Sequence, residues 1–516
     1  MSKSKPEKQF LFVFIAFIFI SVGLLPFFQY HINPDGICYL RIARYYSEGN
    51  FSAAINACWS PLICWLLAPL YKIGIPELIA FRLLNIVIAC FILYKIHLIL
   101  DKFFNNISES FRLSITVSCA LELLILHFNT ITPDLLTLCL LLYLLDIYLS
   151  DDIFTKPFVV GLLGALLYFT KAYSFYFFSA FIILYTIQKI AIKKFLRKDF
   201  KSLFLSVATF LLISICWIFV MHWKYHEWTI SSASGYVFSI LDENGIIHHP
   251  FQSQHILHPL PYAEAYFSWE DMPLIYKQTN PHPEFHKNLF TYFQLIFINC
   301  KKIGEMIFGK YPLLLVLLIP IIAFVVWKRK NTANFFRSSL LIKILAFVTL
   351  YISGYFLISV EPRYIWVLLI VCTILLFNLA FIICRNLKSS FQNIVGLIAM
   401  IPFLYTTISY IVSRINVDKK DYELAMEIKK RIPEESNIAS YNSEDLWNHL
   451  FLSNLHDYGG IASYNIDKEL MDDINKFTIN YIVLTSPGDY QKLPEILKIK
   501  FPVYYDNSEF MILKNE

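Results

Sequence analysis

Apolar runs of nearly membrane-spanning length recur along the chain up to Arg414, and they constrain the fold more than any other feature. A helix needs about 20 predominantly apolar residues to cross the hydrocarbon core of a bilayer. The composition agrees, because 57% of the 516 residues are hydrophobic and only 16% are charged. This composition excludes a soluble globular protein, and we predict a polytopic α-helical membrane protein.

We predict about eleven transmembrane helices from the lengths of these runs. They cover residues 10–29, 77–99, 112–128, 135–149, 157–170, 173–188, 202–222, 311–327, 339–358, 364–384 and 391–413. Basic residues flank alternate ends of the spans, as in the run from Lys189 to Lys201. Because cytoplasmic loops carry the excess of Lys and Arg, we predict a cytoplasmic N-terminus and a location in the inner or plasma membrane. An odd number of spans then places the C-terminal tail outside.

The apolar stretch of residues 157–188 is predicted to be two helices that meet at Lys171. One continuous helix of this length, at about 1.5 Å per residue, would overshoot a hydrocarbon core of about 30 Å. It would also move the basic run after Lys189 to the outer face, against the positive-inside rule. Two short helices instead place Lys171 at the outer surface.

The segment from His31 to Ser47 follows the first span and is predicted to form a turn and then an amphipathic surface helix. Asp35 lies at the N-terminal end of this helix, where a carboxylate often does no more than cap free N–H groups. Arg41 and Arg44 share one face, which we expect to contact water or lipid headgroups. A second surface helix is predicted to begin at Ser60 and Pro61.

Residues 223–310 form a long outer segment, whose end at residues 289–309 is predicted to be an interfacial helix. A loop of this length in a helical domain is usually functional, as a lid or binding loop. Its histidines match no defined metal-ligand spacing, so we interpret them as loop residues. They are His248, His249, His255 and His258.

The chain becomes mixed and charged after the last span, and we divide it into a membrane domain at 1–414 and an extracytoplasmic α/β domain at 415–516. Helices are predicted near residues 422–431 and 468–476. Strands are predicted at 437–441 and within TINYIVLT, and two short strands flank the Asp-Asn-Ser turn near the end. The tail has no P-loop and no G-x-G-x-x-G pattern, so nucleotide binding is not predicted.

Four separate outer loops carry ionisable residues that the predicted topology places at one depth. Asp35 follows the first span, Asp134 begins the helix after the turn N-T-I-T-P-D, and Lys171 joins the two short helices. The fourth loop is Glu361-Pro362-Arg363-Tyr364. Ionisable residues at membrane depth are often functional, so we ask whether these four groups form one site.

The order of these motifs resembles the GT-C class of integral-membrane glycosyltransferases, and in particular the protein-mannosyltransferase-like and aminoarabinose-transferase-like families. The stretches that carry the resemblance are PDGICYLRIA, WSPLICWLLAPLY, TPD, YFTKAY and EPRY, together with the outer C-terminal domain. The resemblance covers nearly the whole chain. It implies a sugar donor carried on a polyprenyl phosphate, an active site that faces outward, and Asp35 at the reaction centre.

Two departures from the pattern concern phosphate and metal binding. Many relatives carry a second acidic residue next to the first, where this chain has Gly36. Several carry a Glu-Lys-Pro-like element where this chain has Trp59-Ser60-Pro61. That element contributes to metal and phosphate binding in some members, so the sequence leaves the cofactor open: a divalent metal is compatible with the class but is not supported by these residues.

Sugar transfer from such a donor needs a base for the acceptor hydroxyl and cations for the departing phosphate. We assign the base role to Asp35 and the donor phosphate to Lys171, Arg363 and Tyr364, since the planar donors of arginine suit a phosphate. Asp134 is assigned to orienting the acceptor or the sugar. The alternatives are a snorkelling Lys171, an Arg363 that pairs with Glu361 or headgroups, and an Asp134 that serves only the turn.

The predicted function is hexosyl or pentosyl transfer from a polyprenyl-phosphate sugar to a lipid, glycan or protein acceptor, among membrane lipids and with no nucleic acid partner. A transporter or flippase would place charges near the bilayer midplane. An envelope polysaccharide polymerase or ligase would share outer arginines and lipid-linked substrates. In a non-catalytic assembly protein, Asp35, Lys171 and Arg363 would lie far apart. The enzyme therefore requires these three residues to border one cavity that opens toward lipid.

Overall fold

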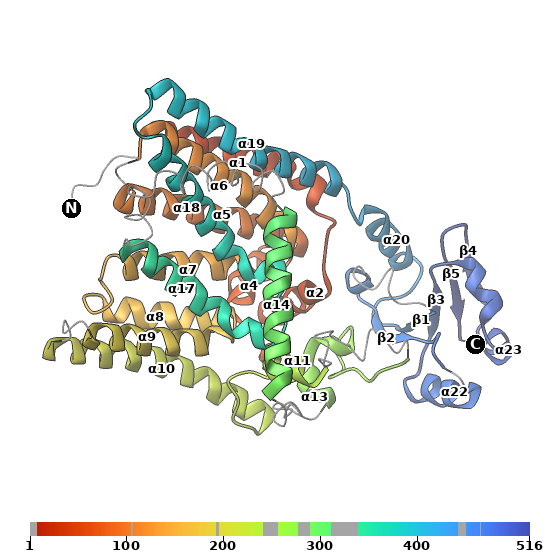
Figure 1. Ribbon diagram of the computed structural model, residues 1–516. Coiled ribbons are helices and arrows are strands. Elements are labelled where there is room, and N and C mark those ends of the chain that lie inside the picture. The colour runs from red at the N-terminus through yellow and green to blue at the C-terminus, as the bar shows by residue number, and fades with distance from the viewer. Residues whose placement is uncertain are drawn as a thin grey trace.

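The computed structural model consists of a large helical domain followed by a small sheet domain (Figure 1). The residues that it describes are 8–104, 107–191, 196–240, 256–276, 289–310, 339–441, 450–464 and 466–515. Eight helical stretches in these ranges are long and apolar enough to cross a membrane. The protein is thus a multi-pass helical membrane protein, as its composition predicts.

Helices occupy every predicted span that falls within the described ranges. They are α1 (Lys8–Phe28), α5 (Glu77–Phe103), α6 (Glu109–Asn129), α7 (Asp134–Leu149), α8 (Pro157–Thr170), α9 (Ser174–Ala191), α10 (Arg197–Tyr225), α17 (Ser339–Ser353), α18 (Trp366–Cys384) and α19 (Ser389–Arg414). The predicted span at 311–327 lies outside the described residues. The predicted break at Lys171 is confirmed, because α8 ends one residue before it and α9 begins three residues after it.

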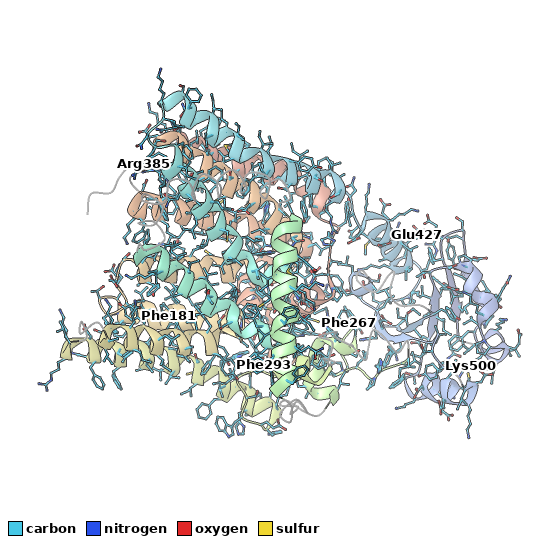
Figure 2. All side chains as sticks on the ribbon, in the orientation of Figure 1. Phe181, Phe267, Phe293, Arg385, Glu427 and Lys500 are labelled. Atoms are coloured by element: carbon cyan, nitrogen blue, oxygen red, sulfur yellow. The ribbon has the colours of Figure 1, made fainter. Side chains whose placement is uncertain are left out.

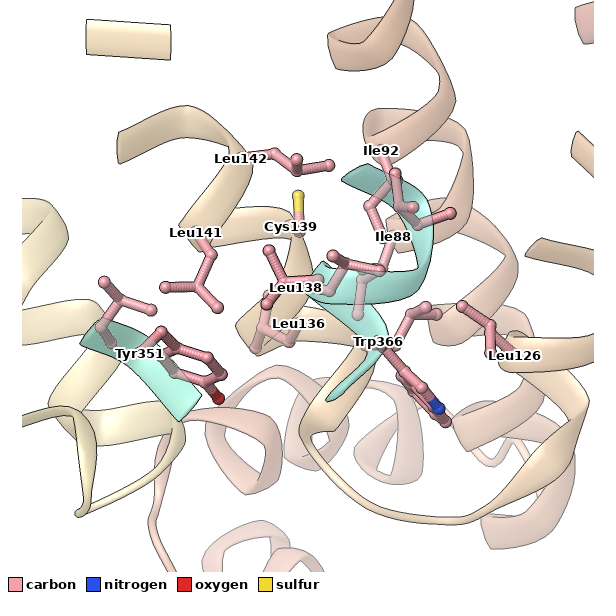
Figure 3. Packing of buried hydrophobic residues seen from close by; sticks show 14 of the residues in the cluster. Ile88, Ile92, Leu126, Leu136, Leu138, Cys139, Leu141, Leu142, Tyr351 and Trp366 are labelled. Atoms are coloured by element: carbon pink, nitrogen blue, oxygen red, sulfur yellow. The ribbon is translucent and has the colours of Figure 1, made fainter. Parts of the chain in front are cut away.

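Helix α7 lies inside the helical domain and packs on several sides (Figure 3). Leu138 and Leu141 of α7 are each 1% exposed, and α5, α8, α17 and α18 pack around the helix. Trp366, the first residue of α18, is also buried against it. Because α7 is apolar on all sides and tightly enclosed, the acidic residue at its first position is held in a fixed place.

Ion pairs gather at the end of the helices opposite to Asp134. Asp146, in the last turn of α7, accepts from Lys95 of α5 at 2.6 Å. Asp151 contacts Lys189 of α9 at 3.0 Å and Lys343 of α17 at 2.9 Å. These are the basic helix ends that the sequence predicts to be cytoplasmic. In Figure 2, Arg385, which is another of these basic residues, lies on the side of the helical domain away from Lys500 of the C-terminal domain.

The segment between α1 and α5 contains the two predicted helices, α2 (Pro34–Glu48) and α4 (Leu62–Lys72), with the short α3 (Phe51–Ala54) between them. The expectation that Arg41 and Arg44 contact water or headgroups is wrong. Arg41 is 2% exposed and its Nε donates to Glu270 at 3.1 Å, whereas Arg44 donates to Glu77 at 2.6 Å. The reason is that residues 256–276, with η1 (Ser268–Asp271) and α13 (Met272–Tyr276), pack on α2 and supply a carboxylate from 229 positions away.

The predicted interfacial helix is α14 (Leu289–Lys310), and in Figure 1 it runs across the direction of α8, α9 and α10. Its Leu295 is buried, while Phe290, Phe293 and Phe297 are 63 to 72% exposed on another face (Figure 2). It packs on η3 (Gly354–Leu357) and η4 (Pro362–Ile365), and α11 (Ala233–Ile240) lies nearby. The exposed phenylalanines favour contact with the acyl and headgroup boundary of a bilayer.

The C-terminal domain is the small α/β unit that the sequence predicts. Its elements are α20 (Lys419–Lys429), β1 (Asn437–Ser440), η5 (Phe451–Ser453), β2 (His456–Gly460), α22 (Asp467–Lys476), β3 (Tyr481–Leu484), η6 (Pro487–Lys492), α23 (Glu495–Lys500), β4 (Val503–Asp506) and β5 (Met511–Lys514). The sheet order is β2-β1-β3-β5-β4. Strand β1 is parallel to β2 and β3, and β5 is antiparallel to β3 and β4. The sheet contacts the outer segment through a bridge between Leu257 and Gly459.

Candidate active site

The structure brings the predicted site residues from four loops to one place at one end of the helices, opposite to the ion pairs of Asp146 and Asp151. Asp35 is the second residue of α2 and Asp134 is the first residue of α7. Lys171 follows the last residue of α8, and Arg363 lies in η4 immediately before α18. Each charged group thus sits where a helix begins or ends, so its backbone is held by the packed bundle behind it.

Arg363 is the centre of this cluster. Its Nη2 donates to Oδ2 of Asp35 at 2.5 Å. Its Nε lies 2.7 Å from Oε2 of Glu361 and 3.8 Å from Oδ2 of Asp134. One guanidinium therefore joins carboxylates from the start of α2, from the start of α7 and from its own short turn.

Lys171 closes the cluster on the far side of Asp134. Its Nζ donates to Oδ1 of Asp134 at 2.6 Å and lies 3.6 Å from the ring centroid of Tyr364. That ring stacks on Tyr355 with centroids 4.5 Å apart. Burial lowers the pKa of Lys171, and the adjacent Asp134 carboxylate opposes that shift. A snorkelling lysine would point to the lipid surface, whereas this ammonium is enclosed by a carboxylate and an aromatic face.

The carboxylates of the cluster differ in exposure. The side chain of Asp134 is 4% exposed, against 27% for Asp35 and 40% for Glu361. Asp134 thus lies beneath the two cations, while Asp35 and Glu361 lie on the open side. The cluster consists of these three carboxylates and the two cations Lys171 and Arg363. Its net charge is therefore −1 (2 − 3) when all five groups are ionised.

The turn before α2 explains two features of the sequence. Asn33 is the N-cap residue, yet its side chain does not cap α2, because its Oδ1 accepts from the N–H of Ile131 at 2.8 Å. Gly36 packs against the same residue, and a Cβ at position 36 would lie 2.7 Å from Cβ of Ile131. A second acidic side chain next to Asp35 does not fit here unless Ile131 moves.

The residues do not fit a divalent metal site in the arrangement described. Among the described residues, no three His, Cys, Asp or Glu side chains converge in a way that would hold a metal ion. The carboxylates of Asp35, Asp134 and Glu361 instead surround the guanidinium of Arg363. Three of the four histidines singled out in the outer segment lie outside the described residues, and the fourth, His258, donates its backbone N–H to Tyr458.

Sequence reasoning missed Glu361 as a site residue and treated it only as a partner for Arg363. It lies 2.7 Å from Arg363 and 3.0 Å from the hydroxyl of Tyr364, which donates to it. The signal was present, because the four residues of E-P-R-Y form one short turn. Glu361 is thus held next to Arg363 by the turn itself, and its carboxylate belongs to the same charge cluster.

Comparison with known proteins identifies similar folds but no related sequence. No family model and no curated protein sequence matches this chain. Among solved structures, ArnT from Cupriavidus metallidurans in the apo state matches with a TM-score of 0.55 and 12% identity over 97% of both chains. The same protein bound to undecaprenyl phosphate matches with a TM-score of 0.55 and 13% identity over 98% of this chain and 97% of that one. The chain therefore has an ArnT-like fold, and the predicted GT-C-like architecture is confirmed.

Proposed function

We propose that the protein is an integral-membrane glycosyltransferase that moves a sugar from a polyprenyl-phosphate donor to an acceptor hydroxyl on the extracytoplasmic face. The observation that carries the proposal is the contact between Asp35 and Arg363, which lie 328 positions apart and meet at the outer helix ends of an ArnT-like fold. An acid and a fixed cation side by side meet the two needs of the reaction, proton removal and phosphate stabilisation. The ArnT structure with bound undecaprenyl phosphate supports a lipid-phosphate donor.

The donor phosphate is assigned to Arg363 and Lys171, with the Tyr364 ring holding the lysine ammonium in place. Both cations are already neutralised by carboxylates. A phosphodiester brings one further negative charge, so it binds only by displacing a carboxylate from Arg363. The candidates are the exposed groups, Asp35 and Glu361, since Asp134 is buried beneath the cations.

This exchange gives the base its function. While Asp35 accepts from Arg363, its Oδ2 is occupied by that hydrogen bond and is held on the guanidinium, away from the acceptor. When the phosphate takes over the guanidinium, the carboxylate is released toward the acceptor. The acceptor oxygen then bonds to the anomeric carbon and the bond from that carbon to the phosphate oxygen breaks. The acceptor proton passes to Asp35, and the electron pair leaves with the polyprenyl phosphate.

Asp134 is assigned as a positioning residue, because its two oxygens face Lys171 and Arg363 and its side chain is almost fully enclosed. A buried carboxylate between two cations fixes the spacing of both. This proposal refines the sequence prediction that Asp134 orients the acceptor or the sugar.

The test is a transfer assay on the full-length protein in lipid nanodiscs. The donors are a panel of polyprenyl-phosphate hexoses and pentoses, and the acceptors come from membrane extracts. Wild type, Asp35→Asn and the matched control Asp467→Asn, an exposed aspartate of the C-terminal domain, are compared. We expect glycoside formation with at least one donor, its loss in Asp35→Asn, and wild-type rates in Asp467→Asn. Movement of the donor across the bilayer without a new glycoside would indicate a flippase, and repeated elongation of one glycan would indicate a polymerase.

A further inference from the structure

Arg82 is a buried charge that the proposed mechanism does not use. It lies in the second turn of α5 and is 0% exposed. Among the described residues, no carboxylate lies within ion-pair distance of its guanidinium. A lone charge in an apolar bundle is costly, so ionisable residues in such places usually have a specific task.

The guanidinium of Arg82 joins the loop before α2 to the last turn of α6 through their backbone carbonyls. Nη1 donates to the carbonyl of Phe128 at 3.0 Å, and Nη2 donates to the carbonyl of His31 at 2.6 Å. One turn along α5, Nδ2 of Asn85 donates to the carbonyl of His127 at 3.2 Å. The last carbonyls of a helix have no partner within the helix, and here α5 supplies the donors for α6.

The same geometry explains how the charge is tolerated. Phe128 is in the last turn of α6, which ends at Asn129. The C-terminal end of a helix carries partial negative charge, and a cation placed there is stabilised. Arg82 is thus balanced by the end of α6 and leaves every carboxylate of the site to Arg363 and Lys171.

The two carbonyls that Arg82 holds lie at the start of the two loops that lead to the site acids, one in the loop before α2 and one in the last turn of α6. His31 precedes Asp35 by four residues, and Phe128 precedes Asp134 by six. Further along, the same two loops contact each other directly, through the bond from Ile131 to Asn33 and the close approach of Gly36 to Ile131. Arg82 therefore ties the two loops together at their base, behind the charge cluster.

We propose that Arg82 is a positioning residue that sets the separation of Asp35 and Asp134 by holding the carbonyls of His31 and Phe128 on one guanidinium. The inference rests on the proposed function for its effect on catalysis, although the contact between the loops stands without it. A shift of one ångström at a reacting group costs up to about 100-fold in rate. The donor phosphate is assigned to Lys171 and Arg363, which lie on other loops, so its binding depends less on Arg82.

The kinetic test compares Arg82→Met and Arg82→Lys with a matched control, Arg112→Met. Arg112 is the arginine at the inner end of the neighbouring helix α6, where it pairs with Asp101. Rates are normalised to monodisperse folded protein. We expect Arg82→Met to lower kcat roughly 10- to 100-fold with KM for the donor changed less than about threefold. Arg82→Lys recovers part of kcat, since an ammonium can still donate to a carbonyl, and Arg112→Met keeps the wild-type kcat. Equal losses of kcat in Arg82→Met and Arg112→Met would overturn the proposal.

A second measurement does not depend on turnover. Hydrogen–deuterium exchange of the full-length protein reports the protection of residues 29–37 and 129–136. We expect faster exchange in both segments of Arg82→Met, and no change there in Arg112→Met. Unchanged exchange would overturn the positioning role. If wild type transfers no sugar yet both segments loosen in Arg82→Met, the proposed function fails while the link between the loops stands.

Discussion

Arg363 donates from Nη2 to Oδ2 of Asp35 at 2.5 Å, so the proposed base and the proposed phosphate-binding cation neutralise each other in this structure. The pair can act on substrate only after it separates. Because the cluster has one more carboxylate than cations, removing a carboxylate helps an anion to bind even where it harms catalysis.

Asp35→Asn is therefore expected to separate binding from turnover. The variant loses the general base, which is worth about 100- to 10,000-fold in rate, so kcat falls by that order. The same substitution frees Arg363 from one carboxylate, so the affinity for undecaprenyl phosphate rises severalfold. Native mass spectrometry titration and the transfer assay measure the two effects. Glu361→Gln serves as the control, with tighter binding and a smaller loss of kcat. Weaker binding in Asp35→Asn would contradict the exchange of partners at Arg363.

Lys171→Met is expected to lower both stability and donor affinity. The side chain of Asp134 is 4% exposed, and loss of its 2.6 Å partner leaves a buried carboxylate whose nearest remaining cation is Arg363, at 3.8 Å. Breaking a buried pair by removing one member costs about 3–5 kcal/mol, which thermal unfolding in nanodiscs would register as a lower midpoint. The double variant Lys171→Met/Asp134→Leu removes both charges.

We expect that double variant to recover most of the unfolding midpoint but no transfer activity. A variant that regains activity together with stability would show that Lys171 serves the fold alone. An unchanged midpoint in the single variant would show instead that the pair is solvated.

The helices of this protein could be predicted from the sequence because the signal for each lies within its own residues. An apolar run of the right length specifies a span wherever its neighbours are, and the break at Lys171 followed from the excessive length of residues 157–188 and from the basic run after them. Strand β2 was missed because its residues, His-Asp-Tyr-Gly-Gly, lack the β-branched and aromatic alternation that identifies a strand. It pairs with β1 and is defined by that partner.

The charges were predicted less well, because the state of a charged side chain depends on groups that are distant in the sequence. The spacing of Arg41 and Arg44 is typical of a solvated helix face. In the structure, however, Arg41 is buried and pairs with Glu270, which lies 229 positions away in the sequence. Arg82 lies inside an apolar run that predicts only a span. Its partners are backbone carbonyls, and because every residue has a carbonyl, the sequence does not indicate which ones Arg82 contacts. Asp35, Asp134 and Glu361 do meet at Arg363, and a topology that places their loops on one side of the membrane leads to this expectation.

We predict that the contact between the C-terminal domain and the outer segment becomes less stable as the pH rises, because of the buried carboxyl group of Asp457. Its backbone N–H donates to Tyr266 at 2.7 Å, its Oδ1 accepts from Gly459 at 3.0 Å, and burial raises its pKa to about 6. The pKa of an unfolded aspartate is about 3.9, so the folded state binds the proton more tightly. Stability is therefore lost as the pH rises from about 4 to about 6, by about 3 kcal/mol in all.

Asp457→Asn removes this penalty, so its unfolding midpoint should exceed that of wild type at pH 8 and approach it at pH 4.5. Scanning fluorimetry of the full-length protein at several pH values measures the difference. Asp506→Asn, at an exposed position of β4, is the control and should show no such trend. A constant offset between Asp457→Asn and wild type at every pH would mean that the carboxyl is not the titrating group.

Sidedness is the remaining requirement, because donor, acceptor and tail domain must share the face that holds Asp35. The ion pairs of Asp146 and Asp151 mark the opposite ends of the helices, where the basic residues gather. We expect Lys198→Cys, at the start of α10, to react with a membrane-impermeant maleimide only after permeabilisation of right-side-out vesicles, in a background with the native cysteines replaced. Asp472→Cys, exposed on α22 of the C-terminal domain, should react in intact vesicles. The two positions control for each other, because only one topology labels Asp472→Cys alone. Labelling of Lys198→Cys in intact vesicles would show that the Asp35–Arg363 cluster faces the cytoplasm, where it could not act on an extracytoplasmic acceptor.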